Sequence, residues 1–306
     1  MSGATCVQAG TVPCAVTTKM RLDTLLAERG VFASRSRAAA SVLAGEVRIG
    51  SDRRRAEKPG QLVPDDVQID VDAAPAFVSR GGTKLANALD EIGLDVGGRR
   101  ALDVGASTGG FTDCLLQRGA AHVVALDVAY GELHWQIRND ERVTVLERAN
   151  ARHLTPEQLP YAPDLVVADV SFISLTKILP AVLASTAARF DALMMVKPQF
   201  EVGRERVGKG GVVRDVSARR AALVAVGAEA QRLGAAVLGY VSSGLPGPKG
   251  NRETFVRLAE AGRAGAREDL ESAAGEVEAD SAPAGSESVG TTRPGARPSG
   301  SEEMHG

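Results

Sequence analysis

Two hydrophobic periodicities alternate along the central part of the chain. Short apolar runs, typical of strands buried on both faces, occur at residues 101–104, 122–127, 143–146, 165–169, 193–197, 236–241 and 253–258. Helical spacing between them predicts helices at about 110–118, 131–138, 175–188 and 217–233. Another helix, opened by Thr83 and Lys84, precedes the first run. Repeated strand–helix units predict an α/β fold with a doubly wound, mostly parallel, Rossmann-like sheet of seven strands.

The region before this unit follows a simpler order of helix, helix and strand. The first predicted helix ends at Gly30, and Ser34 caps a second helix that ends at Gly45. Residues 46–50 and 67–71 alternate as short strands. We therefore predict a small α+β domain at 20–72, a linker at 73–79 and the larger α/β domain at 80–262.

Both ends of the chain are poor in large apolar residues. Residues 263–306 are mostly Ala, Gly, Ser, Pro and Glu and hold nine acidic residues against four arginines. Such segments bury too little apolar surface to offset the conformational entropy that ordering costs. We therefore predict a disordered extension at 1–19 and a disordered acidic tail at 263–306.

Composition excludes several classes of protein. Hydrophobic residues form 44% of the 306 residues, which is too many for a wholly disordered chain. No stretch approaches the roughly 18 apolar residues of a membrane span, and the N-terminus lacks the pattern of a secretory signal. Three widely spaced cysteines without a CxxC pair argue against a disulfide framework or a zinc cluster. We expect a cytoplasmic protein with no membrane partner and no metal.

The net charge of −2 hides an uneven distribution. Residues 19–64 carry ten Lys or Arg and only five acidic residues, which indicates a polyanionic partner or, alternatively, a solvated charged surface. Arg35 and Arg37 lie in the first turn of the predicted second helix, where cations oppose the helix dipole. This local cost suggests that they contact something outside the helix, such as a phosphate.

The segment LDVGASTGGF at 102–111 predicts a strand, a glycine turn and a helix start. Gly105 allows the sharp turn, and the following glycines allow a ligand to approach the helix N-terminus. Asp127 ends the next strand, where a carboxylate can accept both ribose hydroxyls of a nucleoside. Asp103 would repel a dinucleotide pyrophosphate but tolerates cationic S-adenosylmethionine, so we favour the methyl donor. The candidate cofactor residues are Asp103, Gly105, Ser107, Gly109, Gly110, Phe111, Asp127, Asn150 and Asp169.

Four charged residues are predicted to converge at the same edge of the sheet. Lys84 starts the predicted helix that precedes the first strand of the larger domain, and Glu253 opens its last strand. Asp169 and Lys197 close two inner strands. A lysine held among carboxylates and a second lysine in a dry cleft can act as a general base toward an alcohol. Considered alone, each of these residues is better explained as an exposed charge or as one member of a structural ion pair.

Two resemblances extend this interpretation. The segment RLDTLLAERGVFASRSRAAASVLAGEVRIG resembles the RNA-binding domain named after ribosomal protein S-four, and its basic surface is matched here by Arg21, Arg35, Arg37 and Arg48. The motifs SRGGTKL, LDVGASTGGFTDCLL, VVADVSFISL, VKPQFEVG and GNRETF resemble the TlyA (hemolysin A) family of FtsJ-like ribosomal RNA 2′-O-methyltransferases.

The second resemblance implies a class I methyltransferase domain and a Lys-Asp-Lys-Glu set at Lys84, Asp169, Lys197 and Glu253. It also implies S-adenosylmethionine as cofactor and ribosomal RNA or ribosomal subunits as partner, with methylation of cytidine 2′-hydroxyls in 16S and also in 23S rRNA. The alternatives are a membrane-active hemolysin and a non-catalytic rRNA-binding factor. A pore former needs a spanning helix, a closed barrel or a strongly amphipathic basic helix, and the sequence shows none.

Overall fold

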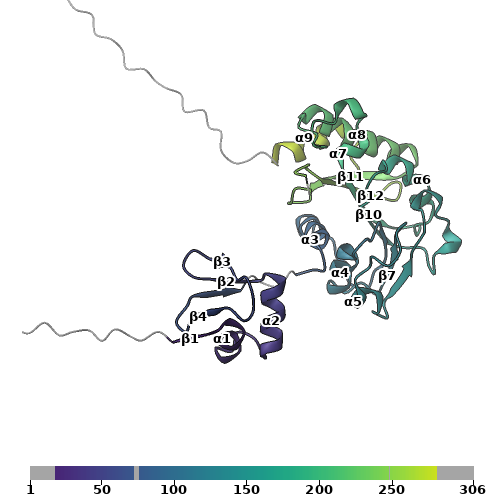
Figure 1. Ribbon diagram of the computed structural model, residues 1–306. Helices are drawn as coiled ribbons and strands as arrows, with labels where there is room; N and C mark the ends of the chain where they lie inside the picture. The colour runs from purple at the N-terminus through teal and green to yellow at the C-terminus, as the bar shows by residue number, and fades with distance from the viewer. Residues whose placement is uncertain (1–17, 72–75, 248, 281–306) are drawn as a thin grey trace, which may run out of the picture. The chain divides into compact units, whose positions relative to one another are not determined.

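The computed structural model describes residues 18–71, 76–247 and 249–280 (Figure 1). The chain divides into two compact units, Met1–Ala76 and Phe77–Gly306. Each unit has its own hydrophobic core, and each is described here by itself.

The first unit is a small α+β domain. Its helices are α1 (Leu22–Glu28) and α2 (Arg35–Ala44), and its strands are β1 (Lys19–Arg21), β2 (Val47–Ile49), β3 (Arg54–Arg55), β4 (Leu62–Pro64) and β5 (Ile69–Val71). The predicted caps of α2 are confirmed, because Ser34 accepts a hydrogen bond from the Arg37 amide and Gly45 adopts a left-handed φ of 79°. Lys19 pairs with Pro64 in an antiparallel ladder, so the predicted disordered extension is wrong at that residue.

The second unit is a seven-stranded sheet between two layers of helices. Its strands are β6 (Arg100–Val104), β7 (His122–Leu126), β8 (Val143–Leu146), β9 (Leu165–Ala168), β10 (Asp191–Val196), β11 (Ala236–Ser242) and β12 (Thr254–Ala259). Their order in the sheet is β11-β12-β10-β9-β6-β7-β8, and within this sheet β12 alone runs in the direction opposite to the other six strands. The predicted mostly parallel, Rossmann-like sheet is confirmed, with every strand close to its predicted position.

Helices cover both faces of this sheet (Figure 1). One core cluster packs α3 (Arg80–Ile92), α4 (Gly110–Gln117) and α5 (Trp135–Arg138) against the sheet. The other cluster packs α6 (Leu179–Ala184), α8 (Val216–Arg232) and α9 (Leu270–Asp280) against the opposite face, and the short α7 (Pro198–Glu201) follows β10. Successive strand residues alternate between the two clusters, as the two-residue period of a strand requires.

The predicted disordered tail is wrong for residues 263–280. Leu270, Ala274 and Val277 bury the apolar face of α9 in the core. Glu278 of α9 accepts three hydrogen bonds from the buried Arg219 guanidinium of α8, at 3.0, 3.1 and 2.5 Å. A short apolar stripe and one buried ion pair therefore order a segment whose average composition is typical of disorder. Residues 281–306, like residues 1–17, lie outside the described residues.

Four other predicted elements differ in their boundaries from the structure. The linker predicted at 73–79 ends earlier, because Phe77 and Val78 pack against the core of the second unit, and residues 72–75 lie outside the described residues. α3 begins at Arg80, so Lys84 lies one turn inside the helix and does not open it. The helices predicted at 131–138 and 175–188 are shorter, since only Trp135–Arg138 and Leu179–Ala184 are α-helical.

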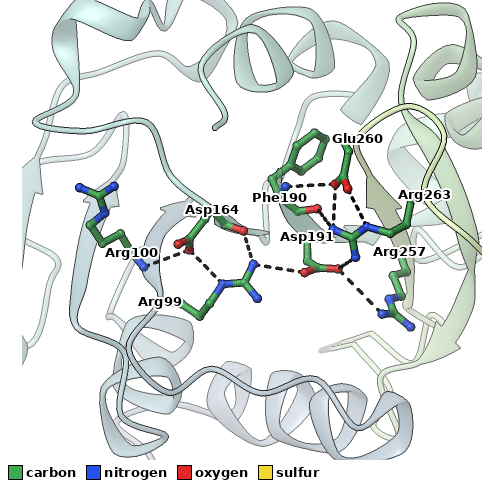
Figure 2. A network of polar contacts seen from close by, with 8 residues as sticks. All are labelled: Arg99, Arg100, Asp164, Phe190, Asp191, Arg257, Glu260 and Arg263. Carbon is green, nitrogen blue, oxygen red and sulfur yellow. Dashed lines mark hydrogen bonds and ion pairs between the residues drawn. The ribbon is translucent and has the colours of Figure 1, made fainter. Parts of the chain in front are cut away.

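A network of ion pairs joins the strands at the edge where the parallel strands begin (Figure 2). Asp191, at the start of β10, is 5% exposed and lies 3.2 Å from Arg99, 3.2 Å from Arg263 and 3.8 Å from Arg257. Arg99 also pairs with Asp164, just before β9, at 3.0 Å. One buried carboxylate therefore connects the starts of β6 and β10 to the end of β12.

We predict that Asp191→Asn lowers the free energy of unfolding by about 2–4 kcal/mol, because it leaves three partly buried arginines without their shared, buried counter-charge. Equilibrium urea unfolding of the full chain measures this loss. Glu229→Gln is the matched control, since it breaks an ion pair whose partner Arg232 is 66% exposed and should leave the unfolding midpoint unchanged. Equal midpoints for both variants would contradict the prediction.

Candidate active site

Strand parity places the predicted charged residues on one face of the sheet. Leu165 and Val167 of β9, Leu193 and Met195 of β10, and Phe255 of β12 all belong to the core cluster that contains α3 and α4. Continuing the two-residue period brings Asp169, Lys197 and Glu253 to the same face at the carboxyl edge. α3 covers this face and contributes Lys84. The structure thus brings together the four residues that the sequence predicted to converge.

These four side chains form two ion pairs. Lys84 Nζ donates to Glu253 Oε2, and both residues are buried, at 6% and 3% exposure. Lys197 Nζ lies 2.6 Å from Asp169 Oδ1 and donates to Ser171 Oγ at 2.9 Å. The two carboxylates come from different places along the sheet edge, Glu253 directly before β12 and Asp169 directly after β9. Each one holds the amine of its lysine at this edge. Lys84, Asp169, Lys197, Ser171 and Glu253 line one cavity of about 420 Å³.

Tight packing around the glycine turn explains why its glycines are needed. Gly105 has a φ of +85°, and a Cβ there would lie 2.8 Å from the carbonyl oxygen of Asp169. Gly109 has a φ of +95°, and its Cβ would meet Leu133, which belongs to the same core cluster as α4. A Cβ at Gly110 would clash with Ser79 and with the first turn of α3. The space beside Gly109 and Gly110 is therefore filled by protein atoms and not by a ligand. The prediction that these glycines let a ligand approach the helix N-terminus is wrong.

The remaining cofactor candidates occupy different environments. Phe111 is 3% exposed and packs against Phe255 at a ring distance of 5.8 Å, so its ring belongs mainly to the core. Asp127 accepts backbone hydrogen bonds from Ser107 at 2.7 Å and from Ala129 at 2.8 Å. Asp127 therefore also shapes the glycine turn. Asn150 accepts a hydrogen bond from the Arg152 amide at 3.0 Å, so it is a turn residue as well as a lining residue.

Asp103 is a fully buried carboxyl group beside this turn. Its Oδ2 accepts a hydrogen bond from Thr112 at 2.7 Å, while its Oδ1 has no hydrogen-bond partner among the described residues. Burial raises the pKa of Asp103 to about 7, against the opposing hydrogen bond from Thr112, and the charge of Asp169 raises it further.

Two further cavities meet at the loop that follows β9. A cavity of about 480 Å³ is lined by Gly105, Ser107, Asp127, Asn150, Asp169 and the loop residues Val170, Ser171, Phe172 and Ile173, among others. A cavity of about 340 Å³ lies on the other side of the loop and includes Lys197, Gln199, Phe200, Lys249, Asn251 and Glu253 in its lining. Ser171 lines all three cavities of the site.

Sequence reasoning missed the residues that shape this loop. Phe172 has a φ of +65°, unusual for a residue other than glycine, and its side chain is 92% exposed. Its ring lies 5.4 Å from the ring of Phe200. Glu201 of α7 accepts hydrogen bonds from Ser174 Oγ at 2.5 Å and from the Leu175 amide at 2.8 Å, and burial raises its pKa. The sequence signal for this loop was the presence of polar residues directly after the ends of β9 and β10.

The predicted RNA-binding arginines are placed on the first unit. Asp23, only 4% exposed, accepts a hydrogen bond from Arg21 Nη2 at 2.7 Å and lies 3.5 Å from Arg35. The Arg21 hydrogen bond lowers the pKa of Asp23 to about 2. Arg35 thus has an internal counter-charge, which weakens the argument that it serves only an external phosphate. Arg37 is exposed on the same helix, and Arg48 lies on β2.

Within the described ranges, no helix combines the length and apolar character that crossing a bilayer requires. The same part of the chain contains no group of three or more His, Cys, Asp or Glu residues arranged to hold a metal ion.

Known proteins share this architecture and much of this sequence. Residues 77–260 match the family described as FtsJ-like methyltransferase. The 16S/23S rRNA (cytidine-2′-O)-methyltransferase TlyA of Mycobacterium tuberculosis is 52% identical over 242 residues, which cover 78% of this chain and 90% of that protein. The chain belongs to the TlyA family of FtsJ-like methyltransferases.

Other members of the TlyA family carry a different name. Hemolysin A of Brachyspira hyodysenteriae is 38% identical over 240 residues, which cover 78% of this chain and 99% of that protein. A solved structure from Streptococcus thermophilus, whose name calls it a candidate hemolysin, is 35% identical, with a TM-score of 0.64 over 87% of this chain and 98% of the other. The hemolysin names and the methyltransferase names therefore refer to proteins of one family.

We predict that Asp103 makes the stability of this TlyA-family protein depend on pH. The pKa of Asp103 is about 7 in the folded chain against an ordinary value of 3.8. At pH values between these two, the folded chain therefore binds more protons at Asp103 than the unfolded chain does. Its contribution to stability should therefore decrease as the pH rises from about 4 to about 7. Asp103→Asn keeps an acceptor for Thr112 but cannot ionise, so urea unfolding across this pH range should show a weaker decrease in the variant. Parallel curves for the two proteins would contradict this assignment.

Proposed function

We propose that the protein transfers a methyl group from S-adenosylmethionine to the 2′-hydroxyl of a cytidine in ribosomal RNA, in 16S and also in 23S rRNA. The single observation that carries the proposal is the pair of lysine–carboxylate contacts, Lys84 with Glu253 and Lys197 with Asp169, beside the glycine-turn cavity. The relative in Mycobacterium tuberculosis, 52% identical, carries this activity in its name.

The chemistry of the cavity beside the glycine turn fits S-adenosylmethionine. Its lining includes the carboxylates of Asp127, Glu132 and Asp169, and no lysine or arginine side chain. The fully buried Asp103 lies at the same turn with one oxygen unpartnered among the described residues. Such a lining favours a cation over a pyrophosphate. We assign the nucleoside end of the cofactor to Asp127 and Asn150, and the cationic end to the side of Asp169. When bound, the cofactor supplies an electrophilic methyl group.

Lys197 is assigned as the group that prepares the attacking alcohol. A ribose 2′-hydroxyl is a weak nucleophile at neutral pH, so its attack requires proton removal or close orientation. Lys197 is 9% exposed and lines two of the three cavities, so its amine is shielded from bulk water but reachable from the crevice. Asp169 holds the Lys197 amine, and Glu253 holds the Lys84 amine, which adds positive potential to the crevice. In the neutral form, Lys197 would accept the hydroxyl proton as the oxygen attacks.

Features of both units support an RNA substrate. The cavity of about 340 Å³ presents the aromatic rings of Phe172 and Phe200 next to Lys197, and an unstacked base can lie on such rings. Lys249 adds a cation to the same lining. We assign the first unit, with Arg21, Arg35, Arg37 and Arg48, to phosphate contacts. The alternatives, a membrane-active hemolysin and a non-catalytic rRNA-binding factor, do not require two lysine–carboxylate pairs beside the glycine-turn cavity.

We predict that Lys197→Ala lowers the rate of methyl transfer about 10²–10⁴-fold, the loss expected on removal of a general base. Lys197→Arg should not restore the rate, because a guanidinium does not deprotonate in this pH range. The measurement is transfer of labelled methyl from the donor to purified 30S and 50S subunits, with donor binding followed by calorimetry as the control for folding.

The outcomes of this assay separate the three functions. No transfer by the wild-type protein to either subunit would exclude the proposed activity and leave an RNA-binding factor or a hemolysin. Near-normal turnover by Lys197→Arg would show that the lysine orients or neutralises and does not accept the proton.

We predict that Arg37→Glu weakens binding to ribosomal subunits and makes its salt dependence shallower by about one unit of slope, the value for one lost phosphate contact. Arg37 suits this test because no side-chain partner of it occurs among the described residues, so folding of the first unit should be unaffected. Binding is measured at several salt concentrations by a filter or sedimentation assay. Arg232→Glu, an exposed charge reversal on α8, is the control, and an identical slope for both variants would argue against the assigned role.

A further inference from the structure

The side chain of Ser171 contacts the proposed base directly. Lys197 Nζ donates to Ser171 Oγ at 2.9 Å and lies 2.6 Å from Asp169 Oδ1. Among the described residues the amine donates its hydrogen bond to Ser171, and its contact with Asp169 Oδ1 is an ion pair without hydrogen-bond geometry. Ser171 is exposed and lines each of the three cavities, so it lies where they meet.

We propose that Ser171 is a positioning residue for Lys197, whose hydroxyl and the Asp169 carboxylate together fix the direction of the Lys197 amine. A neutral amine has two N–H bonds and one lone pair arranged tetrahedrally around nitrogen. The hydrogen bond to Ser171 Oγ directs one N–H bond, and the ion-pair contact with Asp169 holds the amine beside that carboxylate, so the lone pair is confined to the remaining directions. Without the Ser171 hydroxyl, no hydrogen bond restricts rotation about Cε–Nζ, and the amine spends part of its time with its lone pair turned away from the substrate.

The loop that carries Ser171 is itself held in place. Glu201 accepts hydrogen bonds from Ser174 Oγ at 2.5 Å and from the Leu175 amide at 2.8 Å, which tie the end of the loop to α7. At its start, the Asp169 amide donates to the Val104 carbonyl at 3.0 Å. Asp169 and Lys197 directly follow the neighbouring strands β9 and β10. Ser171 lies in a short segment that is fixed at both ends. An acceptor placed in this way can direct the amine without rearranging.

This inference rests on the proposed function, in which Lys197 accepts the proton of the attacking hydroxyl. It adds a residue that acts through Lys197 and not on the substrate. Removing the Ser171 hydroxyl should therefore affect the rate constant of the chemical step and leave the binding of RNA and of the methyl donor nearly unchanged.

The experiment is a double-mutant cycle of Ser171 and Lys197 in the full-length chain, measured as single-turnover methyl transfer to purified ribosomal subunits. Ser171→Ala should lower the rate constant about 10-fold, the size of one lost hydrogen bond to a charged or reacting group. Ser171→Thr keeps the hydroxyl, and since the position is exposed it should recover most of the rate. In the Lys197→Ala background, Ser171→Ala should cause no further loss.

Ser174→Ala is the matched control, because it removes a hydroxyl from the same loop that contacts Glu201 and not Lys197. Any loss that it causes should persist in the Lys197→Ala background. A wild-type rate for Ser171→Ala, a failure of Ser171→Thr to recover activity, or an equal loss with and without Lys197 would overturn the inference while leaving the proposed function intact. A wild-type rate for Lys197→Ala would instead overturn the assigned base, and the inference with it. If Lys197→Ala has no measurable rate, recovery by Ser171→Thr at unchanged KM decides the question.

Discussion

The buried contact between Lys84 and Glu253 is the interaction on which the arrangement of the site depends. It joins α3, which lies outside the sheet, to the residue before β12, the one strand of this sheet that runs antiparallel to its neighbours. Burying either charge alone would cost several kcal/mol, so each residue can occupy its position only while the other is present. Because α3 is fixed in this way, its first turn closes over the glycine turn, where Gly82 and Gly110 approach within contact distance. The walls of the crevice thus depend on this pair of charges together with the apolar packing of α3 against the core.

Much of this arrangement could be predicted from the sequence. The seven apolar runs became the seven strands because strands buried on both faces leave a continuous hydrophobic signal, and their short length between turn residues distinguishes them from buried helices. The convergence of Asp169, Lys197 and Glu253 followed from their places beside strand ends, and the two-residue period of the strands would also have predicted their common face. Lys84 was predicted to join them from its place in the helix before the first strand, but its contact with Glu253 also depends on which face α3 covers. That choice is a tertiary one, and a single amphipathic helix does not encode it.

Other features had no reliable signal in the sequence. α9 becomes ordered because Leu270, Ala274 and Val277 find an apolar surface on the sheet and Glu278 finds Arg219, about sixty residues away along the chain. Composition averages over such specific contacts and therefore predicted disorder. The glycines at 109 and 110 were correctly marked as necessary, but the atoms that require them belong to α3 and to the segment around Leu133. Sequence identifies a position that tolerates no side chain more easily than it identifies what occupies the space.

The two edges of the large sheet use charge in opposite ways. At the edge where the parallel strands begin, Asp191 is surrounded by arginines, and the carboxylates of the network are matched by guanidinium groups from several elements. At the other edge, Asp103 has an unpartnered oxygen among the described residues, and Phe172 adopts a left-handed backbone conformation with its ring in solvent. Unsatisfied groups and strained backbone reduce stability, and they persist where a ligand or a reaction makes use of them. The network gives each of these guanidinium groups a carboxylate partner, although Arg257 Nε has no hydrogen-bond partner among the described residues. It holds the strand starts in register, and this rigidity allows the opposite edge to keep groups that favour the bound state over the free one.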